Sequence, residues 1–432
     1  MNYYSLNKQA PISSFANAVI KGLAPDRGLY FPQQIEPLPK EFFDTIDNKS
    51  FDEIAFETIK QFVVPEIPEN ILKQIVKETL SFDFPVVSIN DSISTLELFH
   101  GPTMAFKDVG ARFMARCLGY FNKDNNNEVT VLVATSGDTG GAVANGFLGV
   151  KGVNVVILYP SGKVSDIQEK QLTSLGQNIR ALEVDGVFDD CQDMVKKAFL
   201  DESITSKMQL TSANSINVAR WLPQLFYFMF AYKQLHNQHD DIVFVVPSGN
   251  FGNICAGMVA QQLGLPVKHF VAANNANHVV TTYLQTESYD PQPTTPTISN
   301  AMDVGNPSNF VRIQEIYGHD FDRLKQNLSS YHYSDDETRS AMLELYQNYS
   351  YIADPHGAVG YLGCKDYLEV NPNAHCVFLE TAHPVKFLDV VEDTVEKSVP
   401  IPEQIKAVMD KEKVATRIKS YEDLKSFLIN TI

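Results

Sequence analysis

Short apolar runs alternate along the chain with segments of helical character. Six of these runs have the length of buried strands and are followed by polar or glycine-containing turns: residues 129–134, 153–158, 179–184, 242–246, 267–273 and 376–379. Nearly continuous apolar strands separated by helices are typical of a parallel sheet that is covered on both faces. Such sheets bind ligands at the carboxyl ends of their strands. The pattern therefore predicts an α/β fold with ligand contacts in the turns that follow the strands.

The two ends of the chain have a different pattern. Residues 51–62 and 71–80 show the spacing of amphipathic helices. The chain from residue 392 onward is highly charged and is predicted to pack as helices. We therefore expect three parts, which are a mostly helical N-terminal region (1–90), a sheet-forming region (91–390) and a C-terminal helical segment (391–432).

Composition and charge exclude several classes of protein. The 432 residues contain 35 Lys and Arg against 52 Asp and Glu, so the formal net charge is −17. With 44% hydrophobic and 20% charged residues, the chain has neither a disordered nor a coiled-coil composition. The acidic balance argues against nucleic acid and anionic membranes as partners, because both need a basic surface. It does not exclude one pocket of local positive charge.

Signals for export, membrane insertion and metal binding are missing from the sequence. The N-terminus lacks a basic segment followed by an apolar stretch, and no apolar run reaches the roughly 18 residues of a membrane span. The five cysteines include no CxxC pair, and the ten histidines show no HExxH spacing. We expect a cytoplasmic protein with reduced thiols, no metal site and no membrane partner.

Residues 100–108 contain the first candidate for chemistry, Lys107. It follows a Gly-Pro turn and is preceded by apolar residues. Apolar surroundings disfavour the ammonium form, which lowers the pKa of a lysine and makes its amine a nucleophile able to form a Schiff base with a carbonyl group. The alternative, which this segment alone favours, is a surface lysine beside Asp108 whose stem lies on apolar neighbours.

A glycine-rich turn, residues 248–253, follows the predicted strand at 242–246. At the start of a helix, such a turn presents free backbone N–H groups and the positive end of the helix dipole to an anion. Gly249 and Gly252 lack side chains, so the backbone can approach a phosphate closely. The turn matches neither the Walker A nor the GxGxxG pattern. It is either a phosphate cradle or a plain strand-to-helix connection.

Three other segments carry hydroxyl and amide side chains. At residues 135–142, hydroxyl groups can hold a carboxylate together with backbone N–H groups, or they can simply cap a helix. Thr381 follows the last predicted strand, where its hydroxyl can bond a ring nitrogen. At residues 212–220, an amide and Arg220 can bind an anion, or they can serve as a helix cap and a surface ion pair.

Taken together, these segments resemble the threonine synthase family. The matching segments are HGPTMAFKD (100–108), SGDTG (136–140), ANSIN (213–217), PSGNFGN (247–253), NAMD (300–303), DPHGA (354–358) and ETAHP (380–384). They occur in the family's order and span nearly the whole chain. The match is closer than that to cysteine synthase or the threonine dehydratases, which share the general fold.

The resemblance implies a fold type II pyridoxal-phosphate enzyme with two doubly wound parallel-sheet domains, here within residues 91–390, and the cofactor between them. It also implies the conversion of O-phospho-L-homoserine and water into L-threonine and phosphate. Lys107 would carry the cofactor and transfer protons, and Thr381 would face the ring nitrogen. The phosphate of the cofactor would be cradled by Gly249, Asn250, Phe251, Gly252 and Asn253.

For Asp138 the resemblance leaves two possibilities. Relatives of this fold often have Asn at this position, close to the phenolic oxygen of the cofactor. An ionised Asp only accepts hydrogen bonds, so either a proton is shared there or Asp138 points elsewhere. The carboxylate of the substrate would be held by Ser136, Gly137 and Thr139. Candidates for contacts with the substrate phosphate are Thr103, Arg112, Lys163, Asn217 and Arg220.

Other functions are compatible with parts of this pattern. They are an amino-acid dehydratase or β-replacement enzyme of the same fold, a non-catalytic anion-binding relative, and a nucleotide-binding enzyme that uses the glycine-rich turn. A non-catalytic relative has no need of a Schiff-base lysine, and the absence of nucleotide-binding patterns weighs against the last alternative. We expect the protein to be a monomer or a homodimer.

Overall fold

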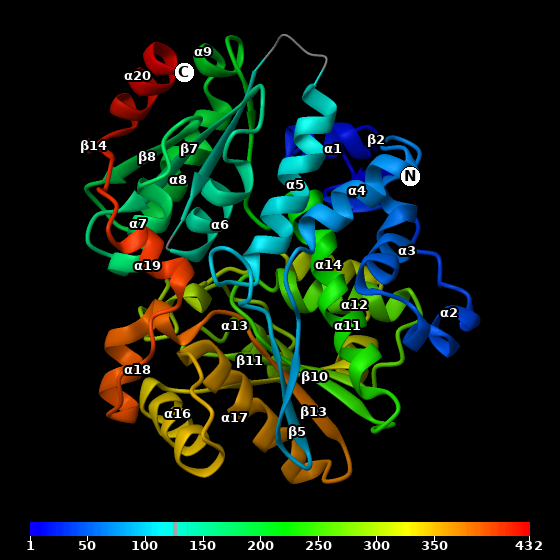
Figure 1. Cartoon of the computed structure of the whole chain (residues 1–432). Coiled ribbons are helices and arrows are strands. Elements are labelled where there is room, and N and C mark those ends of the chain that lie inside the picture. Colours follow the sequence, from blue (N-terminus) through cyan, green and yellow to red (C-terminus); the bar gives the residue numbers. More distant parts are fainter. Residues whose placement is uncertain (124–127, 136) are drawn as a thin grey trace.

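The computed structural model describes residues 1–123, 128–135 and 137–432. Figure 1 shows two α/β lobes, one above the other in the view, with the N-terminal residues in blue beside α5 and α11. The upper lobe contains a five-stranded sheet and the lower lobe a six-stranded sheet. No helix of the described residues is long and apolar enough to cross a membrane.

The N-terminal part combines four α-helices and one 3₁₀ helix with a small antiparallel sheet of order β2-β1-β3. Its elements are β1 (Asn2–Ser5), β2 (Ser13–Ser14), α1 (Phe15–Lys21), β3 (Tyr30–Pro32), α2 (Lys40–Asp44), η1 (Ile46–Asn48), α3 (Phe51–Val63) and α4 (Glu69–Thr79). A capping box of Ser50 and Glu53 starts α3. The two predicted helices are confirmed. The small sheet was not predicted, because strands of two to four residues are too short to show a periodic pattern.

The five-stranded sheet has the order β14-β8-β7-β6-β9, and all of its strands are parallel. Its strands are β6 (Val129–Ala134), β7 (Val153–Pro160), β8 (Ile179–Val184), β9 (Gln209–Thr211) and β14 (Thr416–Ile418). The helices of this lobe are α5 (Lys107–Asn122), α6 (Asp138–Phe147), α7 (Asp166–Thr173), α8 (Phe188–Leu200), α9 (Glu202–Thr205), α10 (Val218–Trp221), α19 (Glu403–Met409) and α20 (Tyr421–Thr431). Helices α5 and α6 pack against β7 from one side and α8 from the other.

The six-stranded sheet has the order β12-β11-β10-β13-β5-β4, and only β4 is antiparallel to its neighbour. Its strands are β4 (Val86–Asn90), β5 (Ile93–Glu97), β10 (Ile242–Pro247), β11 (His269–Asn274), β12 (Leu328–His332) and β13 (His375–Glu380). Around it lie η2 (Leu222–Gln224), α11 (Leu225–Leu235), α12 (Gly252–Gln262), α13 (Val279–Thr286), η3 (Asn300–Met302), α14 (Phe310–Ile316), α15 (Phe321–Asn327), α16 (Asp335–Tyr349), α17 (Pro355–Val370), η4 (Pro384–Phe387) and α18 (Leu388–Val395).

All six predicted strands are present as β6, β7, β8, β10, β11 and β13. Five of them are fully or nearly fully buried, which explains their almost uninterrupted apolar runs, whereas β8 contains the exposed Arg180 and the partly exposed Glu183. The C-terminal segment is not purely helical, since β14 joins the edge of the five-stranded sheet beside β8. Likewise, β4 lies within residues 1–90 but belongs to the six-stranded sheet. Both strands are short edge strands, whose sequence pattern is weak.

Candidate active site

Three of the candidate segments follow three neighbouring strands. In the six-stranded sheet, β10, β13 and β5 are adjacent and parallel, so their carboxyl ends lie at one edge. Lys107 follows β5, the glycine-rich turn follows β10 and Thr381 follows β13. In the five-stranded sheet, the neighbours β6 and β9 lead into Gly137 and Asn217. The topology therefore brings five segments that are distant in the sequence to the carboxyl ends of the strands in the two sheets.

Backbone hydrogen bonds tie the Lys107 segment to the segment after β13. The N–H group of Phe106 donates to the carbonyl oxygen of Thr381 over 2.8 Å, and the N–H group of His383 donates to the carbonyl oxygen of Met104 over 3.1 Å. Helix α5 starts at Lys107, directly after this pairing. Lys107 and Thr381 are thus held next to each other by the main chain, independently of their side chains.

Lys107 has the acid–base properties of a reactive amine. Burial lowers the pKa of Lys107 from 10.5 to about 8; the negative charge of Asp138 opposes this change, and the positive charges of Arg220 and Lys386 add to it. At pH 7 about a tenth of such an amine is free, against less than about a thousandth for an ordinary lysine. Asp108 is bonded to Thr103 and not to Lys107, so the alternative of a surface Lys–Asp pair does not hold.

The glycine-rich turn leaves its N–H groups available. Among the described residues, no N–H group of residues 249–253 has an acceptor. The side chains serve the protein instead, because Asn253 Nδ2 donates to the Pro247 carbonyl oxygen over 2.9 Å and Asn250 Nδ2 donates to Ser215 Oγ over 2.7 Å. Phe251 takes a left-handed conformation (φ 59°) immediately before α12. Unmatched N–H groups at the start of a helix are suited to a phosphate.

Gly249 occupies a place where no other residue fits. A Cβ atom on Gly249 would lie 2.6 Å from Met302 Cα and 3.1 Å from the Ala301 carbonyl oxygen. This neighbouring loop is fixed, because the Ala301 N–H group donates to His356 Nε2 over 3.2 Å. Since Nε2 accepts, the proton of the ring is on Nδ1, which lies 2.6 Å from Asp354 Oδ2. The loop at residues 301–302, which is fixed by His356, therefore supports the glycine-rich turn at Gly249.

The turn after β6 is closed by its own side chains. Thr135 Oγ1 accepts hydrogen bonds from the N–H groups of Gly137 over 3.0 Å and Gly140 over 2.9 Å. Gly137 has φ 151°, and a Cβ atom there would lie 2.6 Å from the Gln168 amide. The half-buried Thr139 hydroxyl bonds none of the described residues, so it stays a candidate for substrate binding. Ser136 lies outside the described residues.

Asp138 is paired with a lysine that was not predicted as part of the site. Asp138 Oδ1 lies 2.7 Å from Lys386 Nζ and accepts a hydrogen bond from Gln168 Nε2 over 3.0 Å. Burial alone would raise the pKa of Asp138, but the positive charges of Lys386 and Lys107 hold this pKa at about 2. The carboxylate is therefore ionised, which disfavours the shared proton and leaves Asp138 unable to donate a hydrogen bond.

The structure argues against two of the predicted substrate contacts. Asn217 is buried at the start of α10, where its Nδ2 donates to the Val19 carbonyl oxygen over 2.8 Å and its Oδ1 accepts from the Ala219 N–H group over 3.0 Å. The Thr103 hydroxyl donates to Asp108 Oδ1 over 2.6 Å. Both side chains are used by the fold, so we correct their role to a structural one. An amide that caps a helix and an amide that binds a ligand look the same in a sequence.

Of the other candidates for the substrate phosphate, Arg220 is the one that lies beside Lys107. Arg112 points away, since its Nε donates to the Thr79 carbonyl oxygen over 3.2 Å, and Lys163 is exposed. Arg220 is buried, and its Nη1 donates to the Lys107 carbonyl oxygen over 3.0 Å. It has no carboxylate partner among the described residues, and its Nε has no acceptor there.

Two buried cations near the site, Lys386 and Arg312, are not identifiable as site residues from the motifs. Arg312 is fully buried, lies 4.2 Å from the Trp221 ring centroid, and donates to the carbonyl oxygens of Ser215 and Tyr30. It thereby joins the N-terminal part to the segment that holds the glycine-rich turn. For Lys386 a signal existed, because a lysine between apolar residues only five positions after Thr381 is unusual for a surface position.

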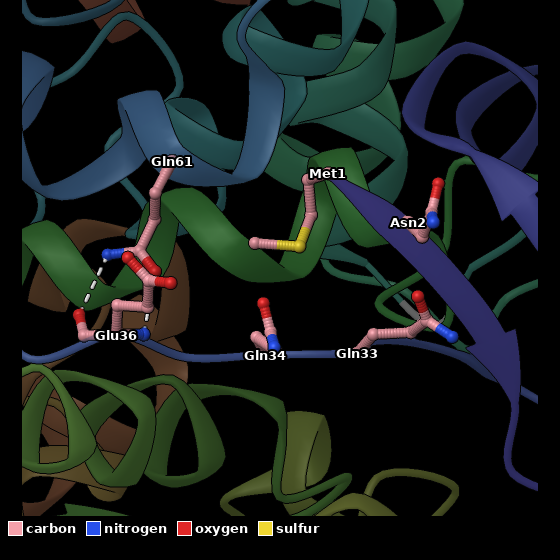
Figure 2. Close-up of a pocket in the computed structure, with 6 residues that line it drawn as sticks. All are labelled: Met1, Asn2, Gln33, Gln34, Glu36 and Gln61. Atoms are coloured by element: carbon pink, nitrogen blue, oxygen red, sulfur yellow. Dashed lines mark hydrogen bonds between the residues drawn. The ribbon is translucent and has the colours of Figure 1, made fainter.

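A pocket of about 340 Å³ lies apart from these residues, in the N-terminal part. Figure 2 shows its lining, which consists of Met1, Asn2, Gln33, Gln34, Glu36 and Gln61. Gln61, on α3, exchanges two hydrogen bonds of 2.9 and 3.0 Å with the backbone of Glu36. Its amide therefore fastens the chain. Within the described residues, no group of three or more His, Cys, Asp or Glu side chains could hold a metal ion.

The residues at the carboxyl ends of the strands of the two sheets fit pyridoxal phosphate. Lys107 offers a nucleophilic amine to the aldehyde, and the turn at residues 249–253 offers unmatched N–H groups to the phosphate. The buried Thr381 hydroxyl, which no described residue bonds, offers a partner to the ring nitrogen. Two α/β lobes with these groups at their strand ends define a pyridoxal-phosphate-dependent enzyme of fold type II.

Comparison with known proteins narrows this class. Residues 94–381 match the family model of pyridoxal-phosphate dependent enzymes, residues 2–80 match the threonine synthase N terminus, and residues 357–428 match the C-terminal part of threonine synthase. A threonine synthase from Serratia marcescens is 42% identical over 406 residues, which cover 94% of this chain and 93% of that protein. The chain belongs to the threonine synthase family.

Solved structures agree in fold over the whole length. The crystal structure of threonine synthase from Escherichia coli matches with a TM-score of 0.94 and 39% identity, covering 100% of both chains. The crystal structure of PLP-bound threonine synthase from Brucella melitensis matches with a TM-score of 0.92 and 32% identity, covering 99% of this chain and 98% of that one. The predicted fold class, family and cofactor are confirmed.

Proposed function

We propose that the protein converts O-phospho-L-homoserine and water into L-threonine and phosphate, with Lys107 carrying the cofactor. The observation that supports this most is the position of Lys107, with a pKa of about 8, beside Thr381 and at the same sheet edge as the unmatched N–H groups of residues 249–253. Bound pyridoxal phosphate supplies an electron sink for negative charge on the carbon atoms of the substrate.

We infer that Lys107 moves the protons in this reaction. The reaction removes a proton from Cα and one from Cβ, expels phosphate from Cγ and returns a proton to Cγ. Water then adds so that its hydroxyl group bonds to Cβ and a proton returns to Cα. An amine with a pKa of about 8 accepts and releases protons near neutral pH, which suits several of these transfers. Asp138 stabilises the protonated amine, whereas Arg220 and Lys386 favour the free amine.

The anionic groups of the substrate require further contacts. For its carboxylate we propose Thr139 together with Ser136, which lies outside the described residues. The N–H group of Gly137 already donates to Thr135 Oγ1 over 3.0 Å, so we do not assign it to the carboxylate. For its phosphate we propose Arg220, because this buried guanidinium beside Lys107 lacks a carboxylate partner among the described residues. A bidentate guanidinium is suited to a phosphate dianion.

We also propose a cytoplasmic location and a monomeric or dimeric state. All five cysteines are buried free thiols, which is the usual state in a reducing compartment. Cell fractionation tests the location, and sedimentation velocity at several concentrations tests the assembly. Recovery in an oxidising compartment, or a sedimentation coefficient above that of a dimer, would contradict these two proposals.

The decisive experiment measures phosphate and threonine formed from O-phospho-L-homoserine. The wild-type protein is expected to form both in equal amounts, and Lys107→Ala is expected to be slower by about 10³-fold or more. Lys163→Ala, at an exposed lysine, serves as the matched control and should keep the wild-type rate. Wild-type rates in Lys107→Ala would refute the role of Lys107. Deamination of threonine or serine, without activity on the phosphorylated substrate, would indicate a dehydratase instead.

A further inference from the structure

Lys386 lies fully buried between the two lobes. Its side chain is 0% exposed, and its Nζ lies 2.7 Å from Asp138 Oδ1 and donates to the Thr103 carbonyl oxygen over 2.8 Å. An ammonium group has three N–H donors, and these two contacts are the ones it makes among the described residues. Because an ammonium group loses its hydration on burial, its third N–H group is a donor that no described residue satisfies and that a ligand oxygen could accept.

The pair joins residues that follow strands of different sheets. Asp138 starts α6 after β6 of the five-stranded sheet, and Lys386 lies in η4 after β13 of the six-stranded sheet. Asp138 is ionised and lies close enough to Lys107 to raise the pKa of this lysine. An ionised carboxylate cannot donate a hydrogen bond to an anionic oxygen. The ammonium group of Lys386, which lies near Lys107, can donate such a hydrogen bond.

Pyridoxal phosphate has two anionic groups that a protein must receive. Its phosphate suits the unmatched N–H groups of residues 249–253. Its phenolic oxygen is attached to the ring carbon next to the one that bears the aldehyde, so it lies beside whatever surrounds the Lys107 amine. We propose that Lys386 is a further cofactor-binding residue, whose remaining N–H group donates to this phenolic oxygen while Asp138 holds the ammonium group in place. This inference rests on the proposed function.

The charge of Lys386 affects the protonation of the Lys107 nitrogen. Arg220 and Lys386 oppose a proton on the nitrogen that joins Lys107 to the cofactor, and Asp138 favours one. Around Lys386 itself lie Asp108, which is bonded to Thr103, and His383. Burial lowers the pKa of His383 to about 4, so this ring is neutral at working pH. Loss of the Lys386 charge should therefore raise the pH at which the Lys107 nitrogen releases its proton.

The test compares three variants that have been loaded with pyridoxal phosphate, without substrate. They are Lys386→Met, Lys386→Arg and the double variant Lys386→Met with Asp138→Leu. The midpoint of the visible absorbance change with pH should rise by about one unit or more in Lys386→Met, because a charge at hydrogen-bond distance has been removed. It should stay within about half a unit in Lys386→Arg. The double variant removes both charges, so its midpoint should return toward that of the wild type.

Cofactor retention provides the second readout. Lys386→Met and the double variant lack the donor to the phenolic oxygen, so equilibrium dialysis should show binding weaker by about tenfold in both. Thermal melting of the cofactor-free variants shows whether they fold. If Lys386→Met alone does not fold, cofactor binding is measured on the double variant.

The outcomes separate this inference from the proposed function. If Lys386→Met or the double variant binds the cofactor as tightly as the wild type, or if the midpoint of Lys386→Met is unchanged, Lys386 is only structural and the proposal is wrong. If borohydride fixes no cofactor on Lys107 of the wild-type protein, the proposed function fails and the inference fails with it.

Discussion

Replacing Lys107 by methionine should make the cofactor-free protein more stable. The pKa of Lys107 is 10.5 in the unfolded chain and about 8 in the folded protein, because burial disfavours the charged amine. Between pH 8 and 10.5 the unfolded state binds more protons than the folded state, so stability rises with pH across this window. Below pH 8 the charged amine costs the folded state at most about 3 kcal/mol, at 1.36 kcal/mol per pKa unit. Methionine has a similar length and no charge.

The assay is calorimetric melting of the cofactor-free proteins at pH 7 and pH 10. At pH 7, Lys107→Met should melt above the wild type. At pH 10 the gap should fall below about 1 kcal/mol, because the amine of the folded wild-type protein is then already neutral. The substitution does not leave Asp138 unpaired, since Lys386 remains 2.7 Å away. Lys163→Met, at an exposed position, is the matched control and should show no gap that depends on pH.

Two results would refute this reasoning. One is a lower melting temperature of Lys107→Met at pH 7, which would mean that the amine contributes packing or bonding that outweighs its desolvation. The other is a gap of equal size at both values of pH, which would mean that the lysine titrates normally. Confirmation would show that this protein keeps a destabilising group at its site, as enzymes commonly do.

Three further substitutions test the surroundings of the site. Gly249→Ala forces a Cβ atom to 2.6 Å from Met302 Cα, so dialysis should show that it binds the cofactor about tenfold or more weakly. The control is Gly119→Ala, whose Cβ atom would meet only the Val150 side chain at 3.1 Å, and it should bind the cofactor normally. Thr381→Asp places a carboxylate at the expected position of the ring nitrogen and should change both the absorbance spectrum and the product mixture; an unchanged spectrum and mixture would contradict this role. His356→Phe leaves the Ala301 N–H group and the Asp354 carboxylate without their partner, so cofactor loss should be faster and melting lower, and an unaltered rate of loss would show that the loop does not support the turn.

Much of the fold could be predicted because buried parallel strands have a simple signature. A strand such as β10 is buried on both faces, so each of its residues is apolar and the run ends where the turn begins. The turn itself was recognisable from its glycines. Edge strands such as β14, with two exposed residues of three, have no such signature and were missed.

The contacts that define the site were harder to predict, because they join residues that are far apart in the chain. Lys386 and Asp138 follow strands of different sheets, and the sequence around either residue does not predict that the two side chains pair. Asn217 shows the opposite problem, since its local pattern fitted a ligand contact and a helix cap equally well. Only the position of the Val19 carbonyl oxygen, which lies on another element, decides between them.

The charge of the site differs in sign from the charge of the chain. The total of −17 counts mostly exposed side chains, whose fields are screened by salt within about 8 to 10 Å. Around Lys107 the buried cations Arg220 and Lys386 face one strongly ionised carboxylate, Asp138, while burial raises the pKa of Asp108. Buried charges are screened much less, and the backbone N–H groups of the glycine-rich turn add further positive potential. An acidic protein can therefore present a positive site to a cofactor and a substrate that both carry phosphate, because the field at the site is set by a few buried groups and not by the total.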